Sequence, residues 1–308
     1  MVRRSDMRRP RALITGSSGF TGRYVIRELE AAGYDVFSLS HGGDVASPNT
    51  ISVDVLDRAA LCSAVASVAP DAVLHLAAIS FVEHGDADEI YRVNVVGTRN
   101  LLEALTELSR PPGIVVLASS ANIYGNATVE PIVEDTAPAP NNDYAVSKLA
   151  MEYMARLWMN KLPIVIARPF NYTGLGQSER FLLPKIVAHF RRGERTIELG
   201  NTDVSRDFAD VRDVARAYAG LVVARPAGMT FNICTGVGRK LDDVLDLMAS
   251  IAGYRINVSV NPEFVRANEV HRLVGSNDAL RAAIGFAPSQ SLSETLAWMY
   301  AGAQLSAP

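Results

Sequence analysis

Short runs of apolar residues alternate along the chain with longer stretches in which apolar positions recur at helical spacing. The first run covers 12–15, and the stretch over 20–32 follows it with an apolar residue every three or four positions. Gly33 comes next, at the place where a glycine commonly ends a helix. The pattern predicts a strand, a tight turn and a helix at the start of the chain.

The same alternation continues to residue 167. It predicts further strands at 36–39, 51–53, 72–76, 114–117 and 164–167, and helices at 61–68, 90–108 and 144–159. Most of these strands are apolar at nearly every position, which is typical of parallel strands covered by helices on both faces. We therefore expect an α/β fold, a Rossmann-type doubly wound parallel sheet.

The apolar runs become shorter after Arg168-Pro169, and glycine, arginine and asparagine become more frequent. This change predicts a smaller C-terminal α/β lobe that binds the substrate. The expected organisation is a basic flexible tail at 1–10, a dinucleotide-binding Rossmann domain at 11–170, and a lobe at 171–308 that partly interleaves with it.

Composition and charge narrow the classes of function. The chain has 308 residues, of which 48% are hydrophobic and 20% charged, and its formal net charge is −3. Nothing in that balance predicts a nucleic-acid partner. The basic residues near the N-terminus are typical of a solvated tail: Arg3, Arg4, Arg8, Arg9 and Arg11. No stretch of about 18 apolar residues occurs, so no membrane partner is expected.

The 2 cysteines, Cys62 and Cys234, and the 5 histidines lack metal-ligand spacing. We therefore expect neither a disulfide framework nor a metal site. A reducing, cytoplasmic location is expected.

A glycine loop joins the first predicted strand to the first predicted helix. Gly16, Gly19 and Gly22 follow a G-x-x-G-x-x-G spacing. Glycines at such a turn let the backbone approach a pyrophosphate, and the helix N-terminus supplies N–H donors and a positive dipole end. We expect this loop to bind a dinucleotide.

The end of the second predicted strand bears on the choice of cofactor. NAD-specific folds usually carry an acid there, whereas this chain has Ser40-His41. The absence of that acid removes repulsion against a 2′-phosphate, so NADP is favoured and NAD stays open. Asp54 is placed to accept a hydrogen bond from the adenine amino group, to cap the next helix, or to do both.

A tyrosine and a lysine lie four residues apart in the predicted helix at 144–159. At that spacing Tyr144 and Lys148 share one helical face, a turn apart. An ammonium held near a phenol favours the phenolate, so we expect the tyrosine pKa, ordinarily about 10, to fall toward neutrality. Such a group can act as a general acid or base on a sugar hydroxyl or ketone.

Together with the glycine loop and the Tyr144–Lys148 pair, five further motifs resemble those of the extended short-chain dehydrogenase/reductases that act on nucleotide sugars. That group is the NAD-dependent epimerase/dehydratase family, and the likeness covers nearly the whole chain. The additional motifs are HLAA at 75–78, NVVGT at 94–98, SSANIYG at 119–125, RPFN at 168–171 and RDFADVRDV at 206–214.

The resemblance implies roles for individual residues. Ser120 would hydrogen-bond the reacting sugar oxygen, Tyr144 would pass a proton to or from it, and Lys148 would hold the nicotinamide ribose. Asn94 would position the site. The cofactor would contact Gly16, Ser18, Gly19, Phe20, Gly22, Ser40, His41, Asp54, Val55, Leu76, Ala77, Ala78, Tyr144 and Lys148. The substrate would contact Ser80, Asn171, Arg206 and Arg266, the two arginines pairing with its phosphates.

Two differences from branches of the family reduce the number of reactions that the chain is expected to catalyse. The 4,6-dehydratases carry an acid where this chain has Asn122, and an amide cannot take the C5 proton. The epimerase-reductases related to GDP-fucose synthase carry a cysteine where this chain has Ala121. What remains is a 4-keto reductase or a 4-epimerase, which need hydride and one proton.

The stretches at 171–181, 199–201 and 266–270 are similar to the branch whose substrates derive from GDP-mannose. The expected reaction is therefore reduction of the C4 ketone of an NDP-4-keto-6-deoxyhexose of the GDP-4-keto-6-deoxy-mannose type. The alternatives are a 4-epimerase of UDP- or dTDP-hexoses with tightly bound NAD, and a non-catalytic nucleotide-sensing scaffold. The family also implies a homodimer. For the apolar face with Met151, Met154 and Trp158, both a subunit contact and core packing stay open.

Overall fold

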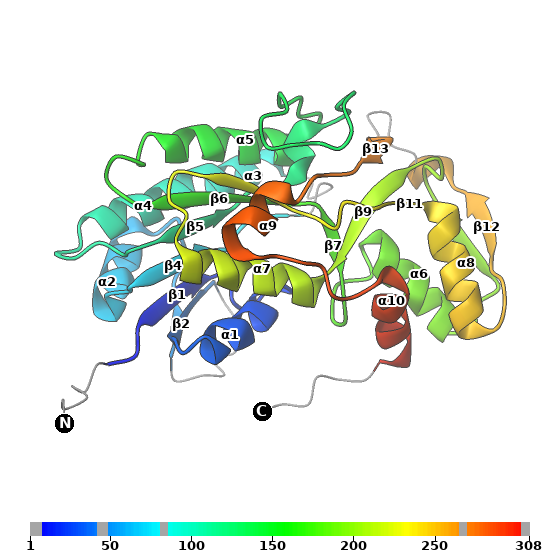
Figure 1. The fold of residues 1–308 in the computed structure, drawn as a ribbon, viewed down its shortest axis with the longest axis horizontal. Coiled ribbons are helices and arrows are strands. Elements are labelled where there is room, and N and C mark those ends of the chain that lie inside the picture. Colours follow the sequence, from blue (N-terminus) through cyan, green and yellow to red (C-terminus); the bar gives the residue numbers. More distant parts are fainter. Residues whose placement is uncertain (1–7, 42–48, 81–85, 265–269, 303–308) are drawn as a thin grey trace. The chain divides into compact units, whose positions relative to one another are not determined.

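The computed structural model describes residues 8–41, 49–80, 86–264 and 270–302. The chain folds into two compact units, each built from several segments (Figure 1). The first unit comprises Met1–Ser119, Asp143–Ala167 and Ala215–Thr230, and the second comprises Ser120–Asn142, Arg168–Val214 and Phe231–Pro308.

Six strands of a seven-stranded sheet organise the first unit; the sheet order is β10-β6-β5-β4-β1-β2-β3, and β10 belongs to the second unit from Phe231 on. The strands of the sheet are β1 (Arg11–Thr15), β2 (Asp35–Ser40), β3 (Thr50–Ser52), β4 (Ala72–His75), β5 (Val115–Ala118), β6 (Ile164–Pro169) and β10 (Thr230–Ile233). The pairings from β3 through β6 are all parallel, which confirms the predicted fold class. The strand order reverses between β1 and β4, the place where open α/β sheets bind ligands.

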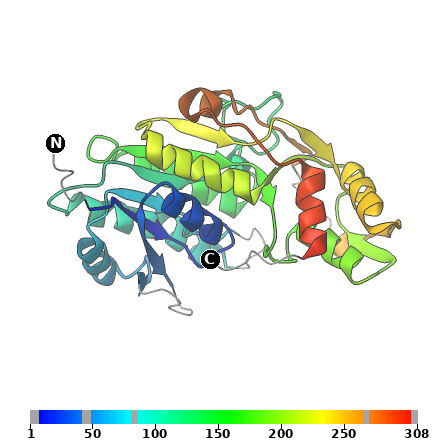
Figure 2. The same ribbon diagram turned by 60° about the horizontal axis from the view of Figure 1, so that its bottom comes forward.

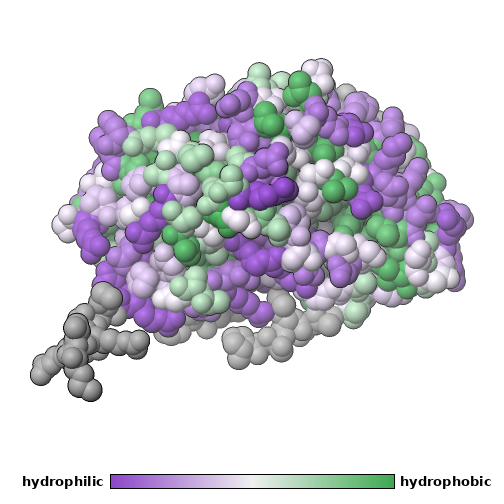
Figure 3. Space-filling view, viewed as in Figure 1, coloured by the Kyte–Doolittle hydropathy of each residue, from purple (hydrophilic) through white to green (hydrophobic). Residues whose placement is uncertain are grey.

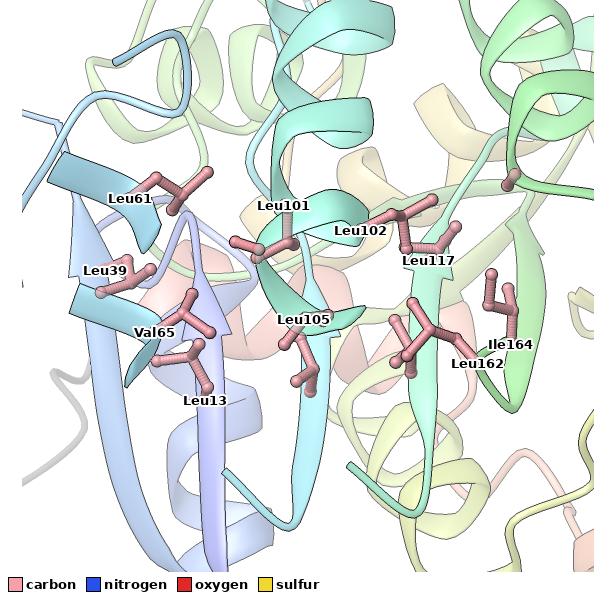
Figure 4. Close-up of a cluster of buried hydrophobic side chains, with 14 of the residues drawn as sticks. Leu13, Leu39, Leu61, Val65, Leu101, Leu102, Leu105, Leu117, Leu162 and Ile164 are labelled. Carbon is pink, nitrogen blue, oxygen red and sulfur yellow. The ribbon is translucent and has the colours of Figure 1, made fainter. Parts of the chain in front are cut away.

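Helices cover both faces of this sheet. They are α1 (Gly22–Ala31), α2 (Arg58–Val68), α4 (Thr98–Thr106), α5 (Asp143–Arg156) and α7 (Val211–Ala224). Leucines and valines of α2 and α4 pack on one face against side chains of the strands, as Figure 4 shows for Leu61, Leu101 and Leu117. Helices α1 and α7 lie side by side on the other face (Figures 1 and 2). The nearly continuous apolar strands follow from this two-sided burial.

The predicted helix at 90–108 is divided into three segments in the structure. Helix α3 (Ala87–Tyr91) leads into a π-helical stretch at Arg92–Gly97, and α4 follows directly. Asn94 lies within the π-helical stretch, where its side chain bonds to distant backbone. π-bulges often mark functional sites in helices.

The second unit contains two small sheets. In one, β9 (Ser205–Asp210) pairs with β7 (Asn171–Thr173), β11 (Gly238–Lys240) and β13 (Arg272–Leu273). In the other, β8 (Thr196–Leu199) pairs with β12 (Asn257–Val260). Helices α6 (Leu182–Arg191), α8 (Leu241–Ala252) and α10 (Leu292–Ala301) share an apolar core, and α9 spans Asp278–Ile284. Short 3₁₀ turns lie at Ala121–Tyr124 and Pro262–Phe264.

Polar residues cover most of the face that Figure 3 shows, and hydrophobic residues appear there in scattered patches. Within the described residues, no helix is both long enough and apolar enough to cross a membrane.

Candidate nucleotide and proton-transfer site

In the loop between β1 and α1, glycines lie so close to neighbouring backbone that a Cβ atom would clash. Gly16 has a φ of +71°, and a Cβ there would lie 2.6 Å from the backbone nitrogen of Ala77. A Cβ at Gly22 would lie 2.4 Å from the carbonyl oxygen of Ser17. Helix α1 begins at Gly22, so its N-terminus opens onto this loop. Pyrophosphate binding by this loop stays a prediction, and the close backbone approach is the geometry that it requires.

Several predicted cofactor residues meet where β1, β2 and β3 end. The Ser40 hydroxyl donates to the Ser18 hydroxyl at 3.1 Å. His41 Nδ1 lies 3.7 Å from an Asp54 carboxylate oxygen, and the His41 side chain is 75% exposed. These groups offer hydroxyl and imidazole donors, with no carboxylate at the end of β2 itself.

The alternative role of Asp54 as a helix cap is wrong. Asp57 caps α2, because its carboxylate accepts the backbone N–H of Ala60 at 3.0 Å. The Asp54 carboxylate instead accepts the N–H of Leu56 at 2.9 Å, within the loop that follows β3. Val55, in the same loop, accepts from the side chain of Asn100 at 3.0 Å.

Two predicted residues that follow β4 are tied to the end of β1. The backbone N–H of Leu76 donates to the Thr15 carbonyl at 3.1 Å, and that of Ala77 to the Thr15 hydroxyl at 3.2 Å. Both residues and Ala78 are half-buried. Phe20, in the glycine loop, packs edge-on against Tyr24 with ring centroids 5.8 Å apart.

His75 is buried and neutral at the end of β4. Its Nδ1 lies 2.6 Å from the Thr15 hydroxyl and its Nε2 lies 2.8 Å from the Thr98 hydroxyl. Because the Thr98 hydroxyl donates to the Asn94 carbonyl at 2.7 Å, it accepts from Nε2–H. Nδ1 then accepts from Thr15. Burial and the Lys148 charge lower the His75 pKa to about 3, so the ring is a structural link.

Asn94 connects this network to helix α5. Its side-chain oxygen accepts the N–H of Ile79 at 2.9 Å, and its Nδ2 donates to the Ile79 carbonyl at 3.1 Å and to the Ser147 hydroxyl at 3.0 Å. The Ser147 hydroxyl donates to the Tyr144 carbonyl at 2.7 Å. Asn94 thus positions the helix that carries Tyr144, as the resemblance implies.

Tyr144 and Lys148 are both buried in helix α5, at 8% and 4% exposure. The Lys148 ammonium lies 5.9 Å from the centre of the tyrosine ring and donates to the Ala118 carbonyl at 2.8 Å. Burial lowers the Lys148 pKa to about 8. The first unit therefore holds the predicted pair side by side, with the amine fixed to the end of β5.

Ser120 is the first residue of the second unit and comes directly after Ser119 in the chain. Its backbone is extended (φ −158°, ψ 144°), and its hydroxyl accepts the N–H of Asn122 at 3.1 Å. The 3₁₀ turn that follows carries Ala121 and Asn122, and neither side chain is acidic or a thiol. The Asn122 amide can hydrogen-bond but cannot act as a base.

A buried polar network holds that turn within the second unit. The Arg168 guanidinium, 4% exposed, donates to the Tyr124 hydroxyl at 2.7 Å and to the Glu134 carbonyl at 2.7 Å. The Tyr124 hydroxyl donates to the Asn232 side chain at 2.8 Å. Arg168 is therefore structural, which explains its place in the RPFN motif.

The predicted substrate residues differ in what the structure says of them. Within the described residues, the side-chain oxygen of Asn171 is buried and has no hydrogen-bond partner. Such an orphaned acceptor is costly unless a ligand or water donates to it. Arg206 is half-buried and donates to the Ser205 carbonyl at 3.1 Å, and Ser80 is exposed. Arg266 lies outside the described residues.

Sequence reasoning missed several residues that build these surroundings. In the RDFADVRDV motif, Asp207 accepts the N–H groups of Thr235 and Gly236, and Asp213 accepts from Ser289. These aspartates secure loops. Glu152 was also missed, although it repeats the four-residue spacing of Tyr144 and Lys148.

In the part of the chain that the structure describes, no group of three or more histidine, cysteine, aspartate or glutamate side chains is arranged to hold a metal ion.

Comparison with known proteins places the chain among nucleotide-sugar enzymes. A GDP-6-deoxy-D-talose 4-dehydrogenase of Aggregatibacter actinomycetemcomitans is 33% identical over 276 residues, which cover 89% of this chain and 90% of that protein. A GDP-6-deoxy-D-mannose reductase of Pseudomonas aeruginosa is 32% identical over 299 residues, covering 93% and 94%.

Solved structures agree with this placement. RMD from Pseudomonas aeruginosa complexed with NADPH has a TM-score of 0.82 at 32% identity, covering 95% of this chain and 98% of that one. A Burkholderia cenocepacia J2315 protein named as a candidate epimerase has a TM-score of 0.89 at 54% identity, covering 95% and 97%.

The profile of one family matches residues 12–234, which include the glycine loop and the Tyr144–Lys148 pair. With that match and these relatives, the chain belongs to the NAD dependent epimerase/dehydratase family.

Proposed function

We propose that this protein is an oxidoreductase that reduces the C4 ketone of a GDP-4-keto-6-deoxyhexose with NADPH. The observation that carries the proposal is the neutral Ala121–Asn122 turn directly after Ser120. An amide at that turn cannot remove a carbon-bound proton, so dehydration lacks its base. Ketone reduction needs a hydride, one proton and a hydrogen bond to the oxygen.

Three side chains divide that work. Ser120 donates a hydrogen bond to the ketone oxygen, and Tyr144 gives its phenolic proton to the same oxygen as the alcohol forms. Lys148 binds the nicotinamide ribose and stabilises the phenolate that Tyr144 leaves. The reduced nicotinamide, when bound, supplies the hydride that adds to C4. The products are a secondary alcohol and the oxidised cofactor.

NADPH is proposed over NADH because of the donors at the end of β2. Ser18, Ser40 and His41 can hydrogen-bond a 2′-phosphate, and Ser18 and Ser40 already touch at 3.1 Å. The similar RMD structure is complexed with NADPH. An acid at Ser40 would reverse this preference, because it would repel the phosphate and accept from a free 2′-hydroxyl.

A GDP-linked substrate is proposed from the two curated relatives, whose names both specify GDP-6-deoxy sugars. Arg206 carries a cation suited to a diphosphate, and the orphaned, buried oxygen of Asn171 can accept a hydrogen bond from a hydroxyl of the substrate. Arg266 is proposed as a second cation for it. Talose and mannose differ in configuration at C4. Both C4 configurations of the product are therefore candidates for this protein.

The subunit contact is proposed to form on α5 and the π-helical stretch beside it. Exposed apolar residues gather there: Val96, Val146, Tyr153 and Leu157. The face predicted from Met151, Met154 and Trp158 instead packs against the core of the first unit. A second copy of the chain is the proposed occupant of the exposed set. A cytoplasmic location stays a prediction that rests on the reduced cysteines.

The decisive experiment follows the absorbance of the reduced cofactor with purified protein and GDP- and dTDP-linked 4-keto-6-deoxy sugars. Stoichiometric loss of NADPH with the GDP sugar is expected, and NMR of the product assigns the C4 configuration. An epimerase would interconvert UDP- or dTDP-hexoses without net consumption of cofactor. A nucleotide-sensing scaffold would bind cofactor and turn over none of these sugars. Either result would contradict the proposal.

A further inference from the structure

Helix α5 carries a buried acid that the proposed reaction does not use. Glu152 is 0% exposed and follows Lys148 by one helical turn, as Lys148 follows Tyr144. A carboxylate is rarely buried unless charged and hydrogen-bonding groups satisfy it. The groups around Glu152 therefore indicate its role.

Glu152 is hydrogen-bonded to Ser119, the residue that directly follows β5. The Ser119 hydroxyl donates to a Glu152 carboxylate oxygen at 2.5 Å. One residue earlier, the Ala118 carbonyl accepts from the Lys148 ammonium at 2.8 Å. The last residue of β5 and the residue that follows it are thus attached to two successive turns of α5. Glu152 and Lys148 together fix the helix to the strand.

Glu152 also acts on the charge of Lys148. Burial lowers the pKa of the lysine to about 8, and the negative charge of Glu152 opposes that shift. Three other described groups face the amine, and none of them is a carboxylate. Tyr144 presents its ring, Ala118 its carbonyl, and His75 is neutral because its pKa is lowered to about 3.

We propose that Glu152 is a positioning residue that keeps the Lys148 amine protonated and fixed beside Tyr144. This inference rests on the proposed function, in which Lys148 binds the ribose and stabilises the phenolate. Without the carboxylate, the buried amine loses its proton at a lower pH. A neutral amine stabilises a phenolate much less, so the pH range of activity narrows from its alkaline side.

The test measures Lys148 itself, without substrate. Protein labelled with ¹³C-lysine is titrated by NMR, and the Lys148 Cε signal is assigned with Lys148→Arg. In Glu152→Gln the midpoint is expected to fall by about one pH unit or more. Ser119→Ala removes the hydrogen bond but keeps the charge, and its midpoint is expected close to that of the parent.

Should Glu152→Gln not fold, Glu152→Asp moves the charge away from the amine and is expected to shift the midpoint in the same direction by less. An unchanged midpoint in the Gln variant, or equal shifts in the Gln and Ser119→Ala variants, would overturn the proposal.

Activity supplies a second readout where the parent reduces the ketone. The alkaline limb of kcat/KM in Glu152→Gln is expected to move to lower pH by the same amount as the Lys148 midpoint. A limb that stays in place while the midpoint moves would refute the link to catalysis. A parent that reduces no ketone would refute the proposed function and leave the titration result standing.

Discussion

At the scale of residues, Tyr144 and Lys148 form a buried pair one helical turn apart. The amine lies 5.9 Å from the tyrosine ring, and both side chains are almost fully buried. Buried charges interact more strongly than exposed ones because water screens them less. The predicted effect of Lys148 on the tyrosine therefore has favourable surroundings, and it stays a prediction until Tyr144 is titrated.

Replacement of Tyr144 by phenylalanine tests the proton donor. We expect kcat to fall about a thousandfold, since general acid catalysis usually contributes two to four powers of ten. The dissociation constant for NADPH, measured by fluorescence, should change little because the ring and Lys148 remain. A variant with a large part of the parent kcat would show that another group gives the proton.

Ser40 tests the choice of cofactor at the same scale. Ser40→Asp should weaken NADPH binding at least about tenfold, because a carboxylate at a few ångströms repels the 2′-phosphate. Binding of NADH should be unchanged or tighter. Ser40→Asn is the control of similar size without charge, and equal losses in both variants would count against a phosphate at this place.

At the scale of elements, the glycine loop and the π-helical stretch decide how the site is built. The loop depends on close approach between Gly16 and Ala77, which follow different strands. The π-helical stretch carries Asn94, whose amide bonds to Ile79 and Ser147. Periodicity predicted one long helix there, and the amide bonds that accompany the distortion come from residues distant in sequence.

Two glycines with positive φ allow the cost of backbone strain to be measured apart from the cost of a steric clash. Gly16→Ala meets the Ala77 backbone, whereas Gly33→Ala has a φ of +89° and nothing within 4 Å of its new Cβ. We expect Gly33→Ala to cost about 1 kcal/mol of unfolding free energy, and Gly16→Ala to cost more by roughly 1–3 kcal/mol. Urea denaturation measures both. Only Gly16→Ala should also weaken NADPH binding.

Tyr124→Phe tests the polar network of the second unit. The substitution keeps the ring but removes the hydroxyl between Arg168 and Asn232, and leaves two buried polar groups each with one partner fewer. We expect a loss of about 1–3 kcal/mol in unfolding free energy. A loss below a few tenths of a kcal/mol would mean that water replaces the hydroxyl.

At the scale of the whole molecule, both units are assembled from segments that alternate along the chain. The first unit carries the nucleotide loop and the Tyr144–Lys148 pair. The second unit begins at Ser120 and carries Asn171 and Arg206. We propose that two copies of the chain associate to form a homodimer.

Leu157→Glu tests that association. Leu157 is 77% exposed beyond the end of α5, and a charge there should disrupt an apolar contact between copies. We expect the parent to sediment as a dimer and this variant as a monomer. Val223→Glu on α7, at a residue 54% exposed, is the matched control and should remain dimeric. A monomeric parent would contradict the proposed contact.

The sequence by itself determined the family, the parallel sheet, an NAD(P)-dependent enzyme and the Tyr144–Lys148 pair. These follow from signals that are local in the chain: apolar periodicity, glycine spacing and residues one helical turn apart. The cap of α2 at Asp57 rather than Asp54 shows the limit of such signals, because neighbouring aspartates offer the same side chain.

Only the tertiary structure decided which distant groups meet. It showed that His75 links Thr15 to Thr98, that Arg168 supports Tyr124, and that Ser119 bonds to Glu152. The physical reason is that a buried polar group must find a partner wherever the fold supplies one. The partner's position in the sequence plays no part in that requirement, so no local pattern predicts it.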